Sequence, residues 1–169
     1  MRLIEALKKI KDLERKHDDI VKKIALNSAI SSIETPTYDG QTKHVTEWLQ
    51  SCEDIVAEIL RLRIAVQTTN LATKVTVELG GKRIKKSIAE WIHRRRDLAM
   101  QSCEAWEALT DRKIKEGAAT GPGGQDMMIK IVRFYDPVKR DKMRELYRSE
   151  PDAVDAALEV ANATTTLIE

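Results

Sequence analysis

Aromatic residues are scarce in this sequence, because three tryptophans, three tyrosines and one phenylalanine make up only 4% of 169 residues. Charged residues make up 33%. This balance disfavours an aromatic ligand pocket or a β-sandwich, and it is typical of long solvated helices around an aliphatic core. A chain of this length can bury a core without disulfides or metals, so we expect a single domain over residues 1–169.

A strong charge of one sign is also missing, since 29 basic and 27 acidic residues leave a net charge of +2. No global field therefore draws the chain toward nucleic acid or an anionic membrane. No stretch approaches the ~18 uninterrupted apolar residues of a membrane-spanning helix. The N-terminal MRLIEALKKIKDLERK spaces its apolar residues with charges, unlike a signal peptide. We expect a cytoplasmic or virion location, with no signal peptide or transmembrane segment.

Sequence signatures of catalysis are lacking as well. Cys52 and Cys103 belong to no metal-ligand spacing, and buried free thiols are the favoured interpretation over a disulfide or a nucleophile. No serine- or cysteine-based catalytic motif appears, and GPGGQD lacks the Gly-Lys-Ser/Thr ending of a phosphate loop. We therefore expect no enzyme activity, no catalytic residue, no metal site and no cofactor.

Two helices dominate the first half of the sequence. Apolar residues with alternating spacings of three and four mark one face of each helix, at the 3.5-residue period of a coiled coil. A helix over residues 2–27 carries Leu3, Ala6, Ile10, Leu13, His17, Ile20 and Ile24, and a helix over 45–70 carries Val45, Trp48, Cys52, Ile55, Ile59, Leu62 and Val66. A long loop over 28–44, containing Pro36 and Asp39-Gly40, joins them. An antiparallel pair is the simplest arrangement, and pairing between molecules is the alternative.

The second half predicts a mixture of strands and helices. Alternation in KVTVEL followed by Gly80-Gly81 predicts a β-hairpin over 74–85, and the capping box Ser87-Ile88-Ala89-Glu90 begins a helix over 88–116. A glycine-rich loop over 117–126 precedes a strand over 128–135, MIKIVRFY. Asp136-Pro137 begins a helix over 137–148, and Pro151 separates it from a last helix over 151–164.

These elements predict a mainly α fold: an antiparallel, coiled-coil-like hairpin of long helices within a helical bundle, plus a small β-hairpin or three-stranded sheet. The edges of such a sheet are either covered or used to pair with a neighbouring chain. Covering within the molecule is the default, and the alternative makes the strand a candidate interaction surface. The candidate residues on it are Met128, Ile129, Ile131, Arg133 and Tyr135.

The densest charge lies in the basic segment 82–96, KRIKKSIAEWIHRRR, which ends in Arg94, Arg95 and Arg96. These three arginines are candidate contacts for an anionic partner, although successive positions on a helix do not share one face. A solvated surface with ion pairs to nearby carboxylates is the favoured interpretation. His17 is a candidate structural residue, because a polar side chain on the face of the first helix can set register; a histidine that is merely tolerated at the edge of the core is the favoured interpretation.

The order of these segments resembles the septicolysin-like family of small helical proteins, found in bacteria and phages. The resemblance rests on MRLIEAL at the start, TNLAT at 69–73, SIAE leading to RDL at 96–98, IKIV at 129–132, and ANATTTL at 161–167. It implies a helical protein that forms oligomers, with no active site to carry over. Asn70 and Asn162 lie within these segments near helix ends, where their amides can satisfy backbone groups, and we take them as candidate structural residues.

Three functional hypotheses follow. The first is a non-enzymatic structural protein that self-associates or joins other structural proteins, such as a component of a phage virion. The second is a membrane-active septicolysin-like protein that opens amphipathic helices onto a bilayer. The third is a nucleic-acid-associated protein that uses the basic segment 82–96. Nucleic acid and membrane are the less expected partners, and assembly is expected to use the strand 128–135 or the loop 28–44.

Overall fold

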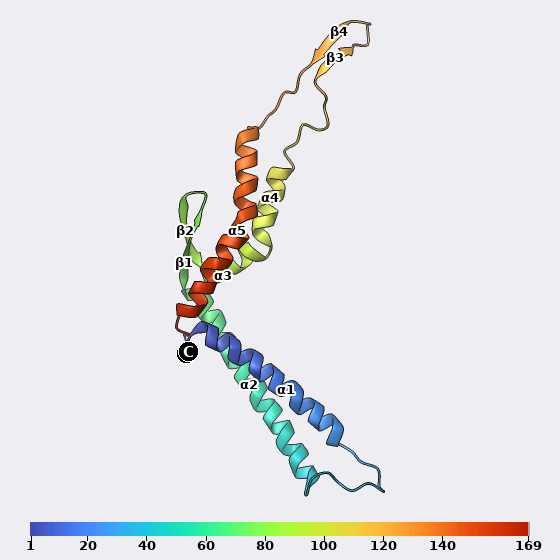
Figure 1. The fold of residues 1–169 in the computed structure, drawn as a ribbon, viewed down its shortest axis with the longest axis vertical. Coiled ribbons are helices and arrows are strands. Elements are labelled where there is room, and N and C mark those ends of the chain that lie inside the picture. The colour runs from blue at the N-terminus through green and yellow to red at the C-terminus, as the bar shows by residue number, and fades with distance from the viewer. Residues whose placement is uncertain (169) are drawn as a thin grey trace. The chain divides into compact units, whose positions relative to one another are not determined.

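The computed structural model describes residues 1–168. The fold is mainly helical with two small β-hairpins, which confirms the expected class of a mainly α protein with a small amount of sheet (Figure 1). In chain order the elements are α1 (Leu3–Asn27), α2 (Gln41–Ala72), β1 (Lys74–Leu79), β2 (Lys82–Ser87), α3 (Ile88–His93), the π-helix η1 (Arg94–Leu98), α4 (Ala99–Glu107), β3 (Gly117–Thr120), β4 (Asp126–Ile129) and α5 (Pro137–Thr164).

The chain forms two compact units. The first unit contains Met1–Val75, Ser87–Ala89 and the end of the chain from Glu159, and the second contains Thr76–Lys86 and Glu90–Leu158. Each unit has its own buried residues, and each is described below by itself. The expectation of one domain over residues 1–169 stays a prediction.

In the first unit, α1 and α2 lie side by side and run in opposite directions (Figure 1). The two ends that the loop joins are held together, because the Gln41 side-chain amide donates a hydrogen bond of 2.7 Å to the Asn27 carbonyl. Ion pairs link the helices further along, from Lys9 to Glu58 at 2.7 Å and from Arg63 to Glu14 at 2.6 Å.

Burial in α1 and α2 follows the apolar faces identified in the sequence. All of the face residues of both helices are buried or half-buried, and Leu3, Ala6 and Leu62 are at most 1% exposed. Straight helices with such faces bury them against each other, because that removes two apolar surfaces from water at once. The face of α2 therefore belongs to the interior of the first unit.

Helix α2 begins at Gln41, four residues before the expected start, and ends at Ala72. The reason is Gly40, whose left-handed φ of 67° turns the chain directly into the helix. The Gln41 side-chain oxygen accepts a hydrogen bond from the Thr37 amide at 3.0 Å, which satisfies part of the incoming loop. The irregular loop is therefore shorter than the expected 28–44.

The opposite end of the first unit joins the two ends of the chain. The Leu3 amide donates to the Thr165 carbonyl at 2.9 Å, and the Leu167 amide donates to the Met1 carbonyl at 2.8 Å. Thr69, which is fully buried on α2, accepts a hydrogen bond from the Ile168 amide at 2.9 Å. These contacts form a short antiparallel bridge that no local pattern in the sequence indicates.

In the second unit, β1 and β2 form the expected hairpin around Gly80 and Gly81, both of which have positive φ. A Cβ atom on Gly80 would lie 2.9 Å from the Leu146 side chain of α5, so the turn also approaches that helix closely. Trp91 on α3 is fully buried and is the largest side chain of the core.

The expected continuous helix over 88–116 is wrong in two respects. It is interrupted by the π-helix η1, and α4 ends at Glu107. Residues beyond Thr110 are mostly charged and offer no apolar face to bury, while Arg112 and Lys113 adopt left-handed backbone conformations that a helix cannot contain.

The expected loop 117–126 and strand 128–135 also differ from the structure. Gly117–Thr120 forms β3, which pairs antiparallel with β4, and β4 ends at Ile129. The sheets are two separate two-stranded hairpins, so the expectation of a three-stranded sheet is wrong. Within residues 1–168, the β-branched residues after Ile129 pair with no other strand, and strand propensity without pairing does not form a sheet.

Helix α5 is one continuous helix of 28 residues and not the expected pair over 137–148 and 151–164. Pro151 removes one backbone donor, yet the residues around it stay buried: Glu150 is 2% exposed and Val154 is fully buried. Tertiary burial on both sides of Pro151 thus outweighs the local preference for a break.

Candidate interaction surfaces

Arg94 does not face solvent as a candidate anion contact would. Its Nε and NH2 donate to the two carboxylate oxygens of Glu150 at 2.6 and 2.5 Å, and its NH1 donates to the Ser102 hydroxyl at 3.1 Å. Glu150 raises the pKa of Arg94 through these hydrogen bonds. The guanidinium also lies 5.6 Å from the centre of the Tyr147 ring. This bidentate pair is part of the packing of α5 against the η1 turn.

Arg95 and Arg96 also have carboxylate partners. Arg95 pairs with Asp155 at 2.5 Å, and Arg96 pairs with its neighbour Asp97 at 3.1 Å. Each of the three arginines is thus offset by a carboxylate, but Arg95 and Arg96 are exposed whereas Arg94 is half-buried. The positive charge available here to a nucleic-acid phosphate is correspondingly small.

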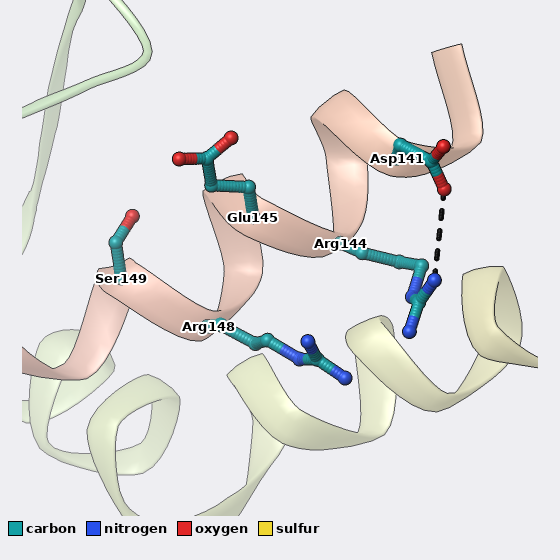
Figure 2. A pocket seen from close by; sticks show the side chains of 5 residues that line it. All are labelled: Asp141, Arg144, Glu145, Arg148 and Ser149. Atoms are coloured by element: carbon teal, nitrogen blue, oxygen red, sulfur yellow. Dashed lines mark ion pairs between the residues drawn. The ribbon is translucent and has the colours of Figure 1, made fainter. Parts of the chain in front are cut away.

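A shallow hollow of about 550 Å³ on α5 is lined by Asp141, Arg144, Glu145, Arg148 and Ser149 (Figure 2). Figure 2 shows Arg144 and Arg148 extending toward α4, whereas Glu145 and Ser149 point away from them. Arg148 forms an ion pair with Glu107 of α4, and Arg144 lies 3.6 Å from Asp141. Arg148 lowers the pKa of Glu107. Arg148, and Arg144 at 3.8 Å, thus reach Glu107 across the two helices, whereas the Arg144–Asp141 contact lies within α5.

A second cavity, of about 600 Å³, lies beside the β1–β2 turn. Apolar side chains of Leu79, Met143 and Leu146 line it together with the exposed Lys82, Lys139 and Lys142. Glu145 and Ser149 also line it, and the Ser149 hydroxyl donates a hydrogen bond of 3.0 Å to the Leu146 carbonyl.

The predicted strand surface is divided by the structure into two parts. Met128 and Ile129 lie on β4 and are 68% and 41% exposed. Arg133 and Tyr135 instead reach Asp111: the Arg133 guanidinium donates to both carboxylate oxygens at 2.7 and 2.6 Å, and the Tyr135 hydroxyl donates at 2.9 Å. Arg133, and then Tyr135, lower the pKa of Asp111 to about 2. Ile131 is half-buried, and its amide donates to Glu116 at 3.0 Å.

The β3–β4 arm, residues 114–134, carries a concentration of exposed apolar side chains. Phe134 is 97% exposed and Val132 is 74% exposed. Ile114, Met127, Met128 and Ile129 are each at least 41% exposed. Isolated apolar residues on a surface are ordinary, but a group along one arm is typical of an interaction site.

Helix α2 has a second apolar face that the sequence analysis missed. Leu49, Val56, Leu60, Ile64 and Leu71, here named the α2 stripe, are 51%, 52%, 61%, 54% and 69% exposed. Their spacings of seven, four, four and seven keep them on one side of the helix. The regular spacing of the α2 stripe is visible in the sequence. It was overlooked because the buried face of α2 alone already predicts a helix.

His17 and Cys52 lie together beside this stripe. They line a groove of about 410 Å³ with Val56 and Leu60, and the structural role of His17 stays a prediction. Both cysteines are free: Cys103 is buried, as expected, and Cys52 is half-buried. The Cys103 thiol lies 3.7 Å from Glu107 and from the Arg144 carbonyl.

Asn70 and Asn162 are both half-buried near helix ends. The Asn70 side-chain oxygen is buried and accepts no hydrogen bond from residues 1–168. The neighbouring Thr69 is the residue that satisfies backbone groups, since it donates to the Ala65 carbonyl at 2.8 Å and accepts from the Ile168 amide.

Neither a cluster of metal-ligating side chains nor a membrane-spanning helix occurs within residues 1–168. Among residues 1–168, no three His, Cys, Asp or Glu side chains come together as metal ligands would. Within the same range, none of the helices combines the length and the apolar character needed to cross a bilayer.

Comparison with known proteins gives the fold and no activity. No family model matches the chain, and no curated protein matches it. The chain is similar to a crystal structure of a functionally unknown conserved protein from Corynebacterium diphtheriae, with a TM-score of 0.56 and 19% sequence identity over 99% of each chain. At this identity the similarity shows a shared fold over nearly the full length of both chains.

Proposed function

We propose that this protein is a non-enzymatic structural protein that self-associates, as one component of a larger assembly such as a phage virion. The observation that carries the proposal is the exposure of large apolar side chains in two organised groups, the α2 stripe and the β3–β4 arm. Water-exposed groups of this kind lower the free energy of a protein when a partner covers them.

In this proposal the α1–α2 pair is a rigid scaffold that presents the α2 stripe. We take it to be a coiled-coil-like hairpin, because its apolar faces repeat at the spacing that lets side chains of one helix enter gaps on the other. The ion pairs Lys9–Glu58 and Arg63–Glu14 fix which residues lie opposite. A hairpin stabilised within one chain leaves the α2 stripe available for a partner.

The paired charges weigh against the nucleic-acid alternative. Binding to phosphates needs cations that can exchange their counterions for the backbone, and Arg94 to Arg96 already have carboxylate partners. The membrane-active alternative draws support only from the resemblance to the septicolysin-like family, which itself stays a proposal.

Sedimentation equilibrium of the full chain tests self-association. One chain has a mass of 19.2 kDa, and we expect a larger mass that rises with concentration between about 1 and 100 μM. A single species of 19.2 kDa throughout this range overturns the proposal of self-association. For an assembly isolated from its source, quantitative mass spectrometry is expected to give more than one copy per particle.

A further inference from the structure

The α2 stripe has a symmetry that the buried face of the same helix lacks. Leu49 and Leu71 lie eleven residues before and after Leu60, and Val56 and Ile64 lie four residues before and after it. At 100° per residue, all five lie within about 40° of Leu60 around the helix axis. The stripe therefore reads the same from either end, with Leu60 at its centre.

Polar residues within the stripe follow the same symmetry. Glu53 and Gln67 lie seven residues before and after Leu60, and both are exposed. If a second α2 lies antiparallel with Leu60 opposite Leu60, Leu49 faces Leu71, Val56 faces Ile64, and Glu53 faces Gln67. A glutamine amide can donate a hydrogen bond to a glutamate carboxylate, so the two polar positions satisfy each other.

The charge of α2 favours the same orientation. Glu58, Arg61 and Arg63 are already ion-paired within the first unit, so the charge that matters is Glu53 on the stripe itself. Parallel copies with Leu60 opposite Leu60 place Glu53 beside Glu53, which costs free energy. Antiparallel copies place Glu53 opposite Gln67, so this charge favours the antiparallel orientation.

The shape of the surface also fits a second helix. The groove of about 410 Å³ lined by His17, Cys52, Val56 and Leu60 borders one half of the stripe. In the antiparallel arrangement the residue opposite Val56 is Ile64 of the second copy. A branched aliphatic side chain entering a groove between two helices is the contact that stabilises packed helices.

We propose that two copies of this chain pair through α2, antiparallel, about a two-fold axis that passes beside Leu60. The proposal rests on the proposed self-association and specifies its surface and symmetry. A two-fold axis of this kind produces a closed dimer, in which each contact occurs twice. The β3–β4 arm is not used by this contact and stays available for further assembly.

Disulfide cross-linking in the full chain tests the symmetry directly. The background variant is Cys52→Ala, with the buried Cys103 retained, and Leu60→Cys, Val56→Cys and Ile64→Cys are each added to it. A disulfide requires Cα atoms within about 7 Å. At the axis, Leu60→Cys meets itself, whereas Val56→Cys in one copy lies about 12 Å along the helix from Val56→Cys in the other.

With diamide as the oxidant, we expect Leu60→Cys to form a covalent dimer at least about ten times faster than Val56→Cys or Ile64→Cys alone. A mixture of Val56→Cys and Ile64→Cys is expected to form the mixed dimer at a rate similar to that of Leu60→Cys. Self-linking of Val56→Cys as fast as that of Leu60→Cys indicates parallel pairing and overturns the proposal.

A charge substitution tests the α2 contact separately from self-association through any other surface. Leu60→Glu places two like charges at the axis and is expected to raise the dimer dissociation constant at least about 100-fold. Leu26→Glu, at a site 81% exposed on α1, is the matched control and is expected to change it less than about threefold. If sedimentation shows an oligomer that Leu60→Glu does not weaken and Leu60→Cys does not cross-link, the protein self-associates but not through α2. If the wild-type chain is monomeric, both the proposed self-association and the proposed α2 contact are wrong.

Discussion

The two compact units achieve stability in different ways. The first unit buries two long aliphatic helix faces against each other, with Leu3, Ala6 and Leu62 almost inaccessible to water. The second unit also has an apolar core, with Trp91 fully buried, but arginine–carboxylate pairs link its helices. Arg94–Glu150 is the most buried of these pairs, with side-chain exposures of 22% and 3%. Aliphatic burial is a non-directional contribution to stability, whereas a buried ion pair stabilises only while both partners remain in place.

This difference determines how each unit responds to substitution. Removing methyl groups from the first unit leaves a cavity, while removing one carboxylate from the second leaves an unpaired cation. The exposed surfaces of the two units, the α2 stripe and the β3–β4 arm, contribute little to either form of stability.

The largest expected effect is that of Leu62→Ala. Leu62 is fully buried on α2, so truncation is expected to lower the free energy of unfolding by about 3 kcal/mol through lost burial and a cavity. Urea denaturation followed by circular dichroism at 222 nm, at a concentration where the chain is monomeric, measures this. Leu60→Ala, two residues away on the exposed stripe, is the control and is expected to change it by less than about 0.5 kcal/mol. Equal losses for the two variants would show that the burial contrast within α2 is wrong.

Glu150→Gln is expected to have the next largest effect, about 2 kcal/mol, because Arg94 then keeps its charge in a mostly buried position without a carboxylate. The same denaturation experiment applies. The control is Asp155→Asn, which removes the exposed partner of Arg95 and is expected to cost less than about 0.5 kcal/mol. If Asp155→Asn costs as much as Glu150→Gln, burial does not set the strength of these pairs.

The contrast between the units also explains what the sequence could predict. The faces of α1 and α2 were identified residue by residue, because apolar periodicity is a local pattern that burial obeys directly. The pairing of Arg94 with Glu150 spans 56 positions, and no local rule connects two charges at that separation. The sequence therefore indicates a charged segment with carboxylates nearby, but not that Glu150 and Asp155 are the partners of Arg94 and Arg95.

Errors in the second unit have the same origin. Pro151 predicted a break, but the burial of Glu150 and Val154 on either side of it depends on distant residues. Strand propensity in MIKIVRFY predicted a strand, but Arg133 and Tyr135 are held by Asp111, more than 20 positions earlier. In each case a non-local contact overrode a correct local preference.

Replacing residues Gly117–Ile129 by a short Gly-Ser linker is expected to have only a small effect. The strands β3 and β4 pair with each other, and their side chains are largely exposed, so their removal takes little burial from the second unit. Calorimetry is expected to show a thermal unfolding midpoint within about 2 °C of that of the wild-type chain. A drop comparable to that caused by Leu62→Ala would show that the arm contributes to the core of its unit.

The smallest expected effect on stability is the loss of the Asp111 charge at low pH. Glu58, a carboxylate of the first unit, serves as the comparison for Asp111 in the second unit. The pKa of Glu58 is lowered to about 2, first by Arg61, three residues away on the same helix, and then by Lys9. The pKa of Asp111 is also lowered to about 2, but by Arg133 and Tyr135, which reach it only in the folded second unit.

Because the folded pKa of Asp111 lies below its ordinary value of 3.8, its contribution to stability is complete above about pH 4 and is lost as the pH falls toward 2. Carboxyl ¹³C chemical shifts measured from pH 5 to 1.5 are expected to show both carboxylates titrating near pH 2. Arg133→Gln is expected to move the Asp111 midpoint most of the way back to its ordinary value, while that of Glu58 stays the same. Because Arg133 is the largest influence on Asp111, an unchanged midpoint in this variant would mean that the contact at the base of the arm does not persist in solution, and the arm would then be joined to the second unit by its backbone alone.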